Sequence, residues 1–363
     1  MQERIPERLK VSPSLVFYII ASMQIGIGFL GFQRFITKHA GQDAWISTII
    51  AGLSLHIILW MIYKIAETVN GDLVTANTYL LGNIGGKLIS TVFIVYYFIY
   101  VLTILRAYIE FIQVWMFSDI SVFWFAFAFM LLCIYVVYGG FRTVVGMSFF
   151  GLILPFCLIL VFSSNIKYAQ FDHLLPIWNH SLKDILLGSY QMLLSFIGFE
   201  TILFYYPFIK DPQRSKKWAH IAILTITLIF TGLMILTITF FSREQLLKAT
   251  WPTLTMWKIV IFPFIERFEY IGIASWNLVI LPNVCLSMWI SSRLMKRIFN
   301  IRQKNGAILI ALITVLVIKL VNSREKVSAL NDIAIKIGFA FAFIYIPILF
   351  ICIMIAKKVK KEE

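Results

Sequence analysis

Long apolar runs with few charged residues dominate this sequence, and they strongly limit what the chain can fold into. A run of about 20 apolar residues is long enough to cross the hydrocarbon core of a bilayer as an α-helix. Ten such runs are recognisable, near residues 12–37, 44–63, 88–116, 121–138, 143–163, 183–209, 218–241, 264–292, 307–321 and 335–356. We therefore predict an all-α integral membrane protein with about ten transmembrane helices, forming a single transmembrane domain over residues 1–363.

The composition agrees with lipid as the main solvent. Hydrophobic residues make up 60% of the chain and charged residues only 14%, whereas soluble proteins carry about 25% charged residues. The net charge of +14 does not indicate a nucleic-acid partner, because Lys and Arg lie in loops and at the ends of apolar runs. More of them fall on the side that holds both termini, so we predict that both termini are cytoplasmic.

The cysteines and histidines give no sign of a metal or redox site. Cys133, Cys157, Cys285 and Cys352 all lie inside apolar runs and form no CxxC pair, and His56 is the one histidine well inside a run. We expect neither a disulfide framework, nor a metal site, nor a cofactor.

The first and sixth apolar runs share an Ile-Gly-Phe centre, at residues 27–29 and 197–199. Because the two runs are five spans apart, an odd number of crossings would give the second copy the opposite topology. This pattern predicts a five-plus-five inverted repeat, with one unit at 12–163 and the other at 183–356.

Glycine at each centre predicts that the first and sixth helices are broken near the bilayer midplane. Without a Cβ, Gly26, Gly28 and Gly198 would let the helix unwind and let a ligand approach the backbone. The start of each second half-helix would favour a carboxylate group. The alternative is that these glycines only allow close helix packing.

Charged residues at membrane depth are candidates for function. Arg106 and Glu110 are spaced i, i+4 in the third run, so we predict an intramembrane ion pair, either as a structural link or lining a water path. Tyr97 and Val101 share a helix face near the expected midplane of the same run. They are candidate ligand contacts, although aromatic residues are common throughout this chain.

Glu200 lies close to the glycine of the sixth run. It could take a proton, meet a cation or bind the amine of a ligand; alternatively, it pairs with Arg106. In the eighth run, Pro282 frees a backbone carbonyl, so that Asn283 and Ser287 become candidates for the same pocket.

The stretch from Ser242 to Phe262 is the longest loop and contains two tryptophans, Trp251 and Trp257. We expect it to form short helices along the outer face. Its role would be either interfacial anchoring or gating.

Two segments resemble a known family. Residues 24–34, QIGIGFLGFQR, and residues 40–47, AGQDAWIS, resemble the B subunit of bacterial spore germinant receptors. These spore permeases are a branch of the amino acid–polyamine–organocation transporter superfamily, and the resemblance extends over the whole chain. It implies a LeuT-like fold, the spore inner membrane, and partnership with an A subunit and a lipoprotein C subunit. It also implies that a small nutrient, such as an amino acid, sugar or nucleoside, binds in a transporter-like pocket and triggers germination.

Carried onto this sequence, the resemblance implies a pocket formed by both broken helices and lined further by the third and eighth spans. The implied ligand-binding residues of the broken helices are Gln24, Gly26, Ile27, Gly28, Gly198, Phe199 and Glu200. Tyr97, Val101, Asn283 and Ser287 are the candidates on the third and eighth spans.

Three classes of function compete. A nutrient-sensing receptor subunit is favoured by the resemblance, whereas physics alone would equally allow an amino acid/proton symporter or permease with Glu200 as proton carrier. An enzyme is disfavoured, because the loops are short and show no carboxylate–histidine cluster or nucleophile–base spacing. We therefore predict no catalytic residues.

Overall fold

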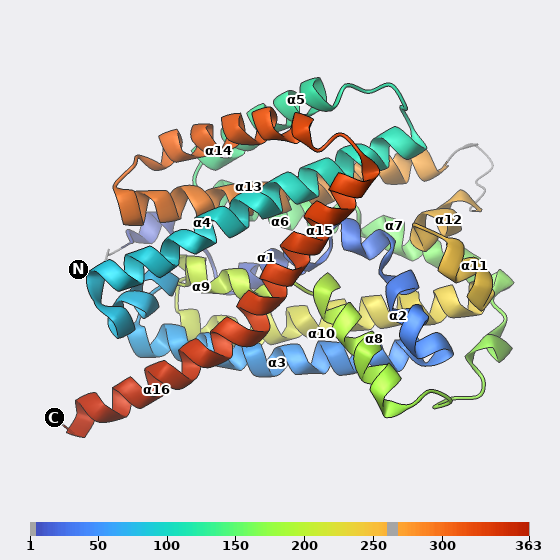
Figure 1. Cartoon of the computed structure of the whole chain (residues 1–363), viewed down its shortest axis with the longest axis horizontal. Coiled ribbons are helices and arrows are strands. Elements are labelled where there is room, and N and C mark those ends of the chain that lie inside the picture. The colour runs from blue at the N-terminus through green and yellow to red at the C-terminus, as the bar shows by residue number, and fades with distance from the viewer. Residues whose placement is uncertain (1–4, 260–267, 363) are drawn as a thin grey trace.

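The computed structural model describes residues 5–259 and 268–362, and within these ranges the chain is a bundle of helices (Figure 1). The one β-bridge in the described ranges pairs Val11 with Ile209. The all-α prediction is confirmed.

Each of the ten predicted ranges contains a helix or a pair of helices. In chain order these are α1 (Leu15–Gln24) with α2 (Phe32–Ala40), α3 (Ala44–Val69), α4 (Leu73–Trp115), α5 (Val122–Tyr138), α6 (Phe141–Ile153) with α7 (Phe156–Val161), α8 (Leu182–Ser195) with α9 (Ile202–Tyr205), α10 (Pro212–Phe240), α13 (Phe268–Phe299), α14 (Gln303–Val317), and α15 (Arg324–Phe339) with α16 (Ile346–Glu362). The predicted start of the eighth range, residues 264–267, lies outside the described residues.

Length and hydropathy identify which helices can cross a membrane. Among the described residues, seven helical segments are long and apolar enough, and the pair α8 and α9, bent by 50°, makes an eighth. α1 and α5 are shorter apolar helices. Together these correspond to the ten predicted runs.

Two helices begin more than ten residues earlier than predicted. α4 begins at Leu73 rather than near residue 88, with a kink at Gly82 (φ 70°), and the last span begins at Arg324 rather than near residue 335. Both added segments mix polar and apolar residues, so no uninterrupted apolar run marks them as helical. Asp72 caps the start of α4 by accepting a hydrogen bond from the Thr75 N–H at 3.0 Å.

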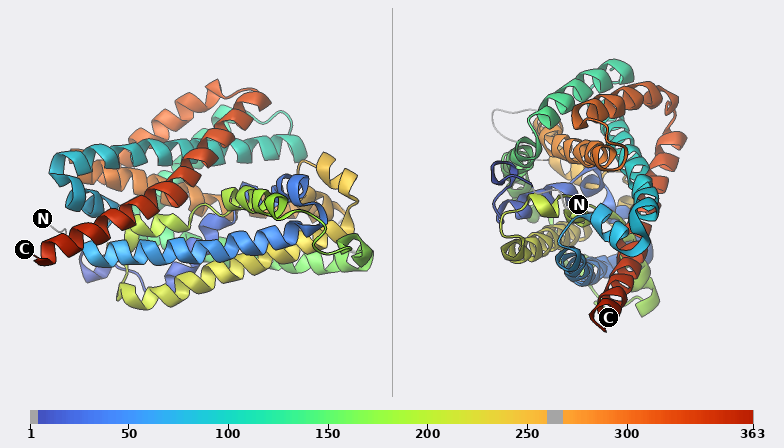
Figure 2. Two further views of the ribbon diagram at one scale, coloured as in Figure 1. Left: turned by 60° about the horizontal axis from the view of Figure 1, so that its bottom comes forward. Right: turned by 90° about the vertical axis from the view of Figure 1, so that its left-hand side faces the viewer.

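Helices five spans apart pack against each other in the centre of the bundle. α4 packs along α13, and α3 packs along α10, in the two most extensive helix contacts of the described chain. The views in Figure 2 show these elongated helices running side by side, with the two chain ends at the same end of the bundle. The five-plus-five repeat and the boundaries of its two units stay a prediction.

The segment from Ser242 onward forms short helices, as predicted: α11 (Arg243–Lys248) and α12 (Pro252–Lys258). Both lie at the end of the bundle opposite the two chain ends (Figure 1), and α12 is packed into the bundle, since its Leu254, Met256 and Trp257 are buried. The reason is its apolar side chains: the Trp257 ring stacks on Phe162 at 5.5 Å. Residues 260–262 of the predicted loop lie outside the described residues.

Candidate functional site: two adjacent helix breaks

The first apolar span is broken where the sequence predicts. α1 ends at Gln24, Ile25 and Gly26 are extended, and a short 3-10 helix, η2 (Ile27–Leu30), follows before α2 begins at Phe32. A helix that ends inside the bundle leaves carbonyl and N–H groups without intrahelical partners. The break therefore exposes backbone hydrogen-bonding groups in the interior.

The sixth span is broken as well. α8 ends at Ser195, and the chain turns at Gly198 with φ 129° before the 3-10 helix η6 (Phe199–Thr201) leads into α9. This φ value is one that L side chains rarely adopt, so the turn requires glycine. A Cβ on Gly198 would also lie 2.8 Å from the Cβ and 2.9 Å from the carbonyl oxygen of Met23. The second break is thus pressed against the last turn of α1.

Amide side chains brace the two breaks. Gln24 Nε2 donates to the carbonyl of Phe196 at 3.0 Å, across the space between the breaks. From α13, Asn283 Nδ2 donates to the carbonyl of Ile25 at 3.0 Å. Each break therefore has a carbonyl that is satisfied by a side chain from another helix, as buried backbone groups in membrane proteins require.

Glu200 closes the turn of the second break. Its side chain is buried, with 1% exposed, and its Oε2 accepts a hydrogen bond from the backbone N–H of Gly198 at 2.7 Å. The alternative partner considered from the sequence, Arg106, makes its contact elsewhere, at the carbonyl of Val321. The Glu200 carboxyl group also lies within electrostatic range of Tyr97.

The candidates on the third and eighth spans are buried beside the breaks. Tyr97 and Val101 on α4 are almost fully buried, and the Tyr97 ring packs edge-on against Phe204 of α9 at 5.1 Å. Ser287 on α13 donates to the carbonyl of Asn283 at 2.8 Å, which engages its hydroxyl within its own helix.

Part of the backbone at the first break is accessible rather than buried. Gly28 is exposed and Gly26 and Ile27 are half-buried, whereas Gln24 and Phe29 on either side are buried. A Cβ on Gly28 would meet Ser195 Oγ at 3.7 Å, so Gly28 faces the end of α8. Accessible backbone of the first break therefore lies beside the end of α8, next to the second break.

Buried acceptors near the breaks remain unused. Counting partners over the described residues, Gln24 Oε1 and Asn283 Oδ1 accept no hydrogen bond, although both side chains are buried. The hydroxyl groups of Tyr96 and Tyr97 on α4 also have no hydrogen-bond partner among the described residues. Since buried polar groups normally have partners, these atoms are suited to hydrogen-bond a ligand or water.

The predicted ion pair between Arg106 and Glu110 is not formed in the described structure. Arg106 Nε donates to the carbonyl of Val321 at 2.7 Å, while Glu110 Oε1 lies 3.9 Å from Arg324 Nε. The i, i+4 spacing allowed the pair, but the loop between α14 and α15 offers each side chain a different partner.

Tyr96 and the last span also contribute to the site, and neither was predicted to do so. Tyr96 approaches α15 so closely that a Cβ on Gly338 would lie 2.8 Å from its hydroxyl. Residues Ala340–Tyr345 then form a π-helix, from which Phe343 packs against Phe199 with centroids 6.4 Å apart. Gly338 was a signal of this contact, and Pro347, which has no N–H to donate to the carbonyl of Phe343, was a signal of the π-helix.

Paired broken helices inside a bundle of apolar helices define a membrane protein of the LeuT-like fold. The crystal structure of MhsT in complex with L-phenylalanine matches it with a TM-score of 0.58 at 13% identity, covering 94% of this chain and 98% of that chain. This likeness confirms the predicted fold class.

The chain belongs to the spore permease family, because the family model described as spore germination protein matches residues 10–327. The spore germination protein GerQB of Bacillus cereus is 44% identical over 96% of this chain and 97% of its own length. Spore germination protein B2 of Bacillus subtilis (strain 168) is 24% identical over 80% of each chain. The predicted family is confirmed, and this protein is an integral membrane protein of that family.

Proposed function

We propose that this protein is the membrane subunit of a nutrient-germinant receptor, and that it binds a small nutrient where the two helix breaks meet. The observation that carries the proposal is the pair of adjacent breaks, joined by the hydrogen bond from Gln24 to Phe196, with the exposed Gly28 beside them. A ligand seated there would contact both broken spans at once. It could therefore shift the balance between two arrangements of the bundle through different affinity for each.

An amino acid fits this site best. Gly26 and Gly28 present backbone N–H groups without a Cβ to shield them, and such groups bind a carboxylate. The unused acceptors Gln24 Oε1 and Asn283 Oδ1 can accept hydrogen bonds from an ammonium group. MhsT, which shares the fold, was crystallised in complex with L-phenylalanine, and this supports an amino-acid ligand here.

The receptor role is favoured by the relatives, which are named spore germination proteins. On this proposal, the protein lies in the spore inner membrane with both termini cytoplasmic and assembles with an A subunit and a lipoprotein C subunit. It is not an enzyme, and it passes the ligand-induced change to its partners. The second candidate, an amino acid/proton symporter, is favoured by the transporter fold and the buried Glu200.

The test compares binding with uptake, in detergent and in proteoliposomes, for individual radiolabelled amino acids beginning with L-phenylalanine. Gly28→Trp should block the site, because a side chain there starts 3.7 Å from Ser195 Oγ and points between the breaks. Gly232→Trp is the matched control, since Gly232 is exposed on α10 and a Cβ there meets nothing within 4 Å.

Saturable binding that is lost in Gly28→Trp but kept in Gly232→Trp, without accumulation inside the vesicles, would support the receptor. Uptake driven by a proton gradient, and abolished by Glu200→Gln, would replace it with the symporter. Binding that survives Gly28→Trp would refute the proposed location of the site.

A further inference from the structure

A pocket with three basic side chains lies where three chain segments meet, away from the helix breaks. Its volume is about 440 Å³. Lys10 comes from the segment before α1, Arg142 from the first turn of α6, and Lys210 from the chain after η7 (Tyr206–Phe208). Each is at the end of an apolar span, where Lys and Arg meet the lipid headgroup region.

Backbone hydrogen bonds hold these segments together. The Val11 N–H donates to the carbonyl of Phe208 at 2.8 Å, and the Lys210 N–H donates to the carbonyl of Val11 at 2.9 Å. On the other side, Arg142 Nη1 donates to the carbonyl of Arg8 at 3.0 Å. The basic side chains are thus brought together by structure.

The charge of the pocket is only partly compensated. Glu7 forms an ion pair with Lys10 at 2.8 Å, and the hydrogen bond from Lys10 lowers the pKa of the Glu7 carboxyl group, which also feels the charge of Lys210. Within the described residues, neither Arg142 nor Lys210 forms an ion pair of 4.0 Å or less. One exposed acid therefore faces three cations, and the pocket keeps a positive charge.

The deeper wall of the pocket is apolar. Leu15 on α1 and Phe149 on α6 line it, and the Phe149 ring packs against Tyr18 with centroids 4.6 Å apart. Phe149 is two helical turns beyond Arg142, which places it roughly 10 Å further along α6. Between them, a Cβ on Gly146 would meet nothing within 4 Å, so the floor is open. The basic side chains and the apolar side chains of the pocket match the charged headgroup and the apolar chains of a phospholipid.

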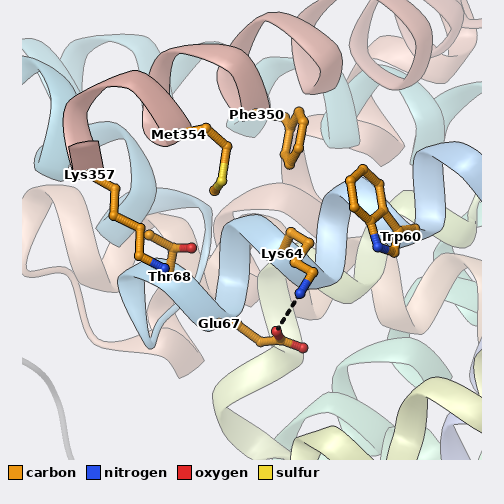
Figure 3. A pocket seen from close by; sticks show the side chains of 7 residues that line it. All are labelled: Trp60, Lys64, Glu67, Thr68, Phe350, Met354 and Lys357. Carbon is orange, nitrogen blue, oxygen red and sulfur yellow. Dashed lines mark ion pairs between the residues drawn. The ribbon is translucent and has the colours of Figure 1, made fainter.

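A second pocket, of about 290 Å³ between α3 and α16, shows the contrast (Figure 3). It also combines lysines with aromatic side chains, but Glu67 stands among them. Glu67 lies 4.0 Å from Lys64 and also pairs with Lys216. A half-buried acid therefore stands beside one of its two lysines, Lys64, inside the pocket itself, and this pocket is less suited to an anion.

We propose that the pocket formed by Lys10, Arg142 and Lys210 binds an anionic glycerophospholipid, with its headgroup phosphate on the cations and its acyl chains toward Phe149. Basic pockets between transmembrane helices are suited to anionic headgroups, and bidentate binding of phosphate suits arginine. A lipid bound here would fasten the segment before the first broken span to the segment after the second. The inference is independent of the nutrient site.

The test counts bound lipid by native mass spectrometry while the full chain, in neutral detergent, is titrated with phosphatidylglycerol or phosphatidylcholine. Arg142→Gln combined with Lys210→Gln should weaken phosphatidylglycerol binding by roughly 30-fold, since each cation near an anionic lipid contributes about fivefold. Lys183→Gln combined with Lys258→Gln is the control, because it removes the same charge from two exposed lysines elsewhere.

Filling the pocket is the second arm. Gly146→Leu should block the lipid without a backbone clash, and Gly232→Leu places the same side chain in open space on another helix. Preference for phosphatidylglycerol that is lost in Gly146→Leu and in the Arg142/Lys210 variant, but kept in both controls, would establish the site. Equal binding of both lipids, or equal loss in targets and controls, would overturn it. Full competition by inorganic phosphate or glycerol 3-phosphate would also overturn it, because it would show a site for soluble phosphate.

Discussion

Replacing Gly198 by alanine tests whether the second helix break depends on its glycine. The backbone there has φ 129°, and for a residue with a Cβ such a conformation costs about 1–3 kcal/mol. The added Cβ would also lie 3.0 Å or less from three atoms of Met23, two of them in the backbone. Overpacking of this kind typically costs about 1–3 kcal/mol. The two effects together predict that Gly198→Ala lowers the free energy of unfolding by about 2–6 kcal/mol.

Two other glycines provide matched controls. Gly26 at the first break has φ −145°, which any residue adopts, and its Cβ would meet Asn283 Nδ2 at an ordinary 3.6 Å. We expect Gly26→Ala to cost less than about 1 kcal/mol. Gly232 lies in open space in the interior of α10, where alanine should stabilise the helix by about 0.5–1 kcal/mol.

The assay is denaturant unfolding of the three purified variants in one detergent, followed by tryptophan fluorescence, with the change in free energy taken from the midpoints. From the most stable variant to the least stable, the expected order is Gly232→Ala, Gly26→Ala and Gly198→Ala. If Gly198→Ala were as stable as Gly26→Ala, the turn would not require glycine, and the close contact between the two breaks would be wrong.

Two further predictions concern polar contacts between helices. Asn283→Ala should lower the free energy of unfolding by about 1–3 kcal/mol, because the buried carbonyl of Ile25 loses its donor. Denaturant unfolding measures this change, and an unchanged midpoint would contradict the prediction. Arg297→Ala should cost about 2–4 kcal/mol, because it leaves the nearly buried Asp72, now 2.6 Å from Arg297 Nη1, without its partner. The same measurement on Lys248→Ala, which breaks an exposed ion pair, should show almost no change.

The apolar runs predicted which segments are helices, but not where the helices end. The early starts of α4 and of the last span lie in segments of mixed polarity, where helix formation depends on caps and neighbours rather than on hydropathy alone. α12 shows the same limit, because its tryptophan suggested an interfacial anchor and is in fact buried. Trp257 is equally suited to either environment, and only the packing of Phe162 against it decides.

The candidate site was predictable in its location and not in its contacts. Gln24 and Asn283 were expected near the breaks, yet their particular acceptors, the carbonyls of Phe196 and Ile25, depend on how three helices meet. Arg106 was expected to pair with Glu110, four residues later, but its side chain donates to the carbonyl of Val321 instead. A side chain inside a bundle binds the acceptor that packing brings to it.

By itself, the sequence determined that this protein is a membrane-embedded helical bundle and that its first and sixth spans break near Gly26 and Gly198. Both conclusions rest on local properties, because hydropathy selects the solvent of a segment and a missing Cβ selects where a helix can open. The tertiary structure alone decided that the two breaks touch and are cross-braced, and that Arg142 joins Lys10 and Lys210 in one basic pocket. These arrangements follow from the packing of distant segments, which no local pattern in the chain records.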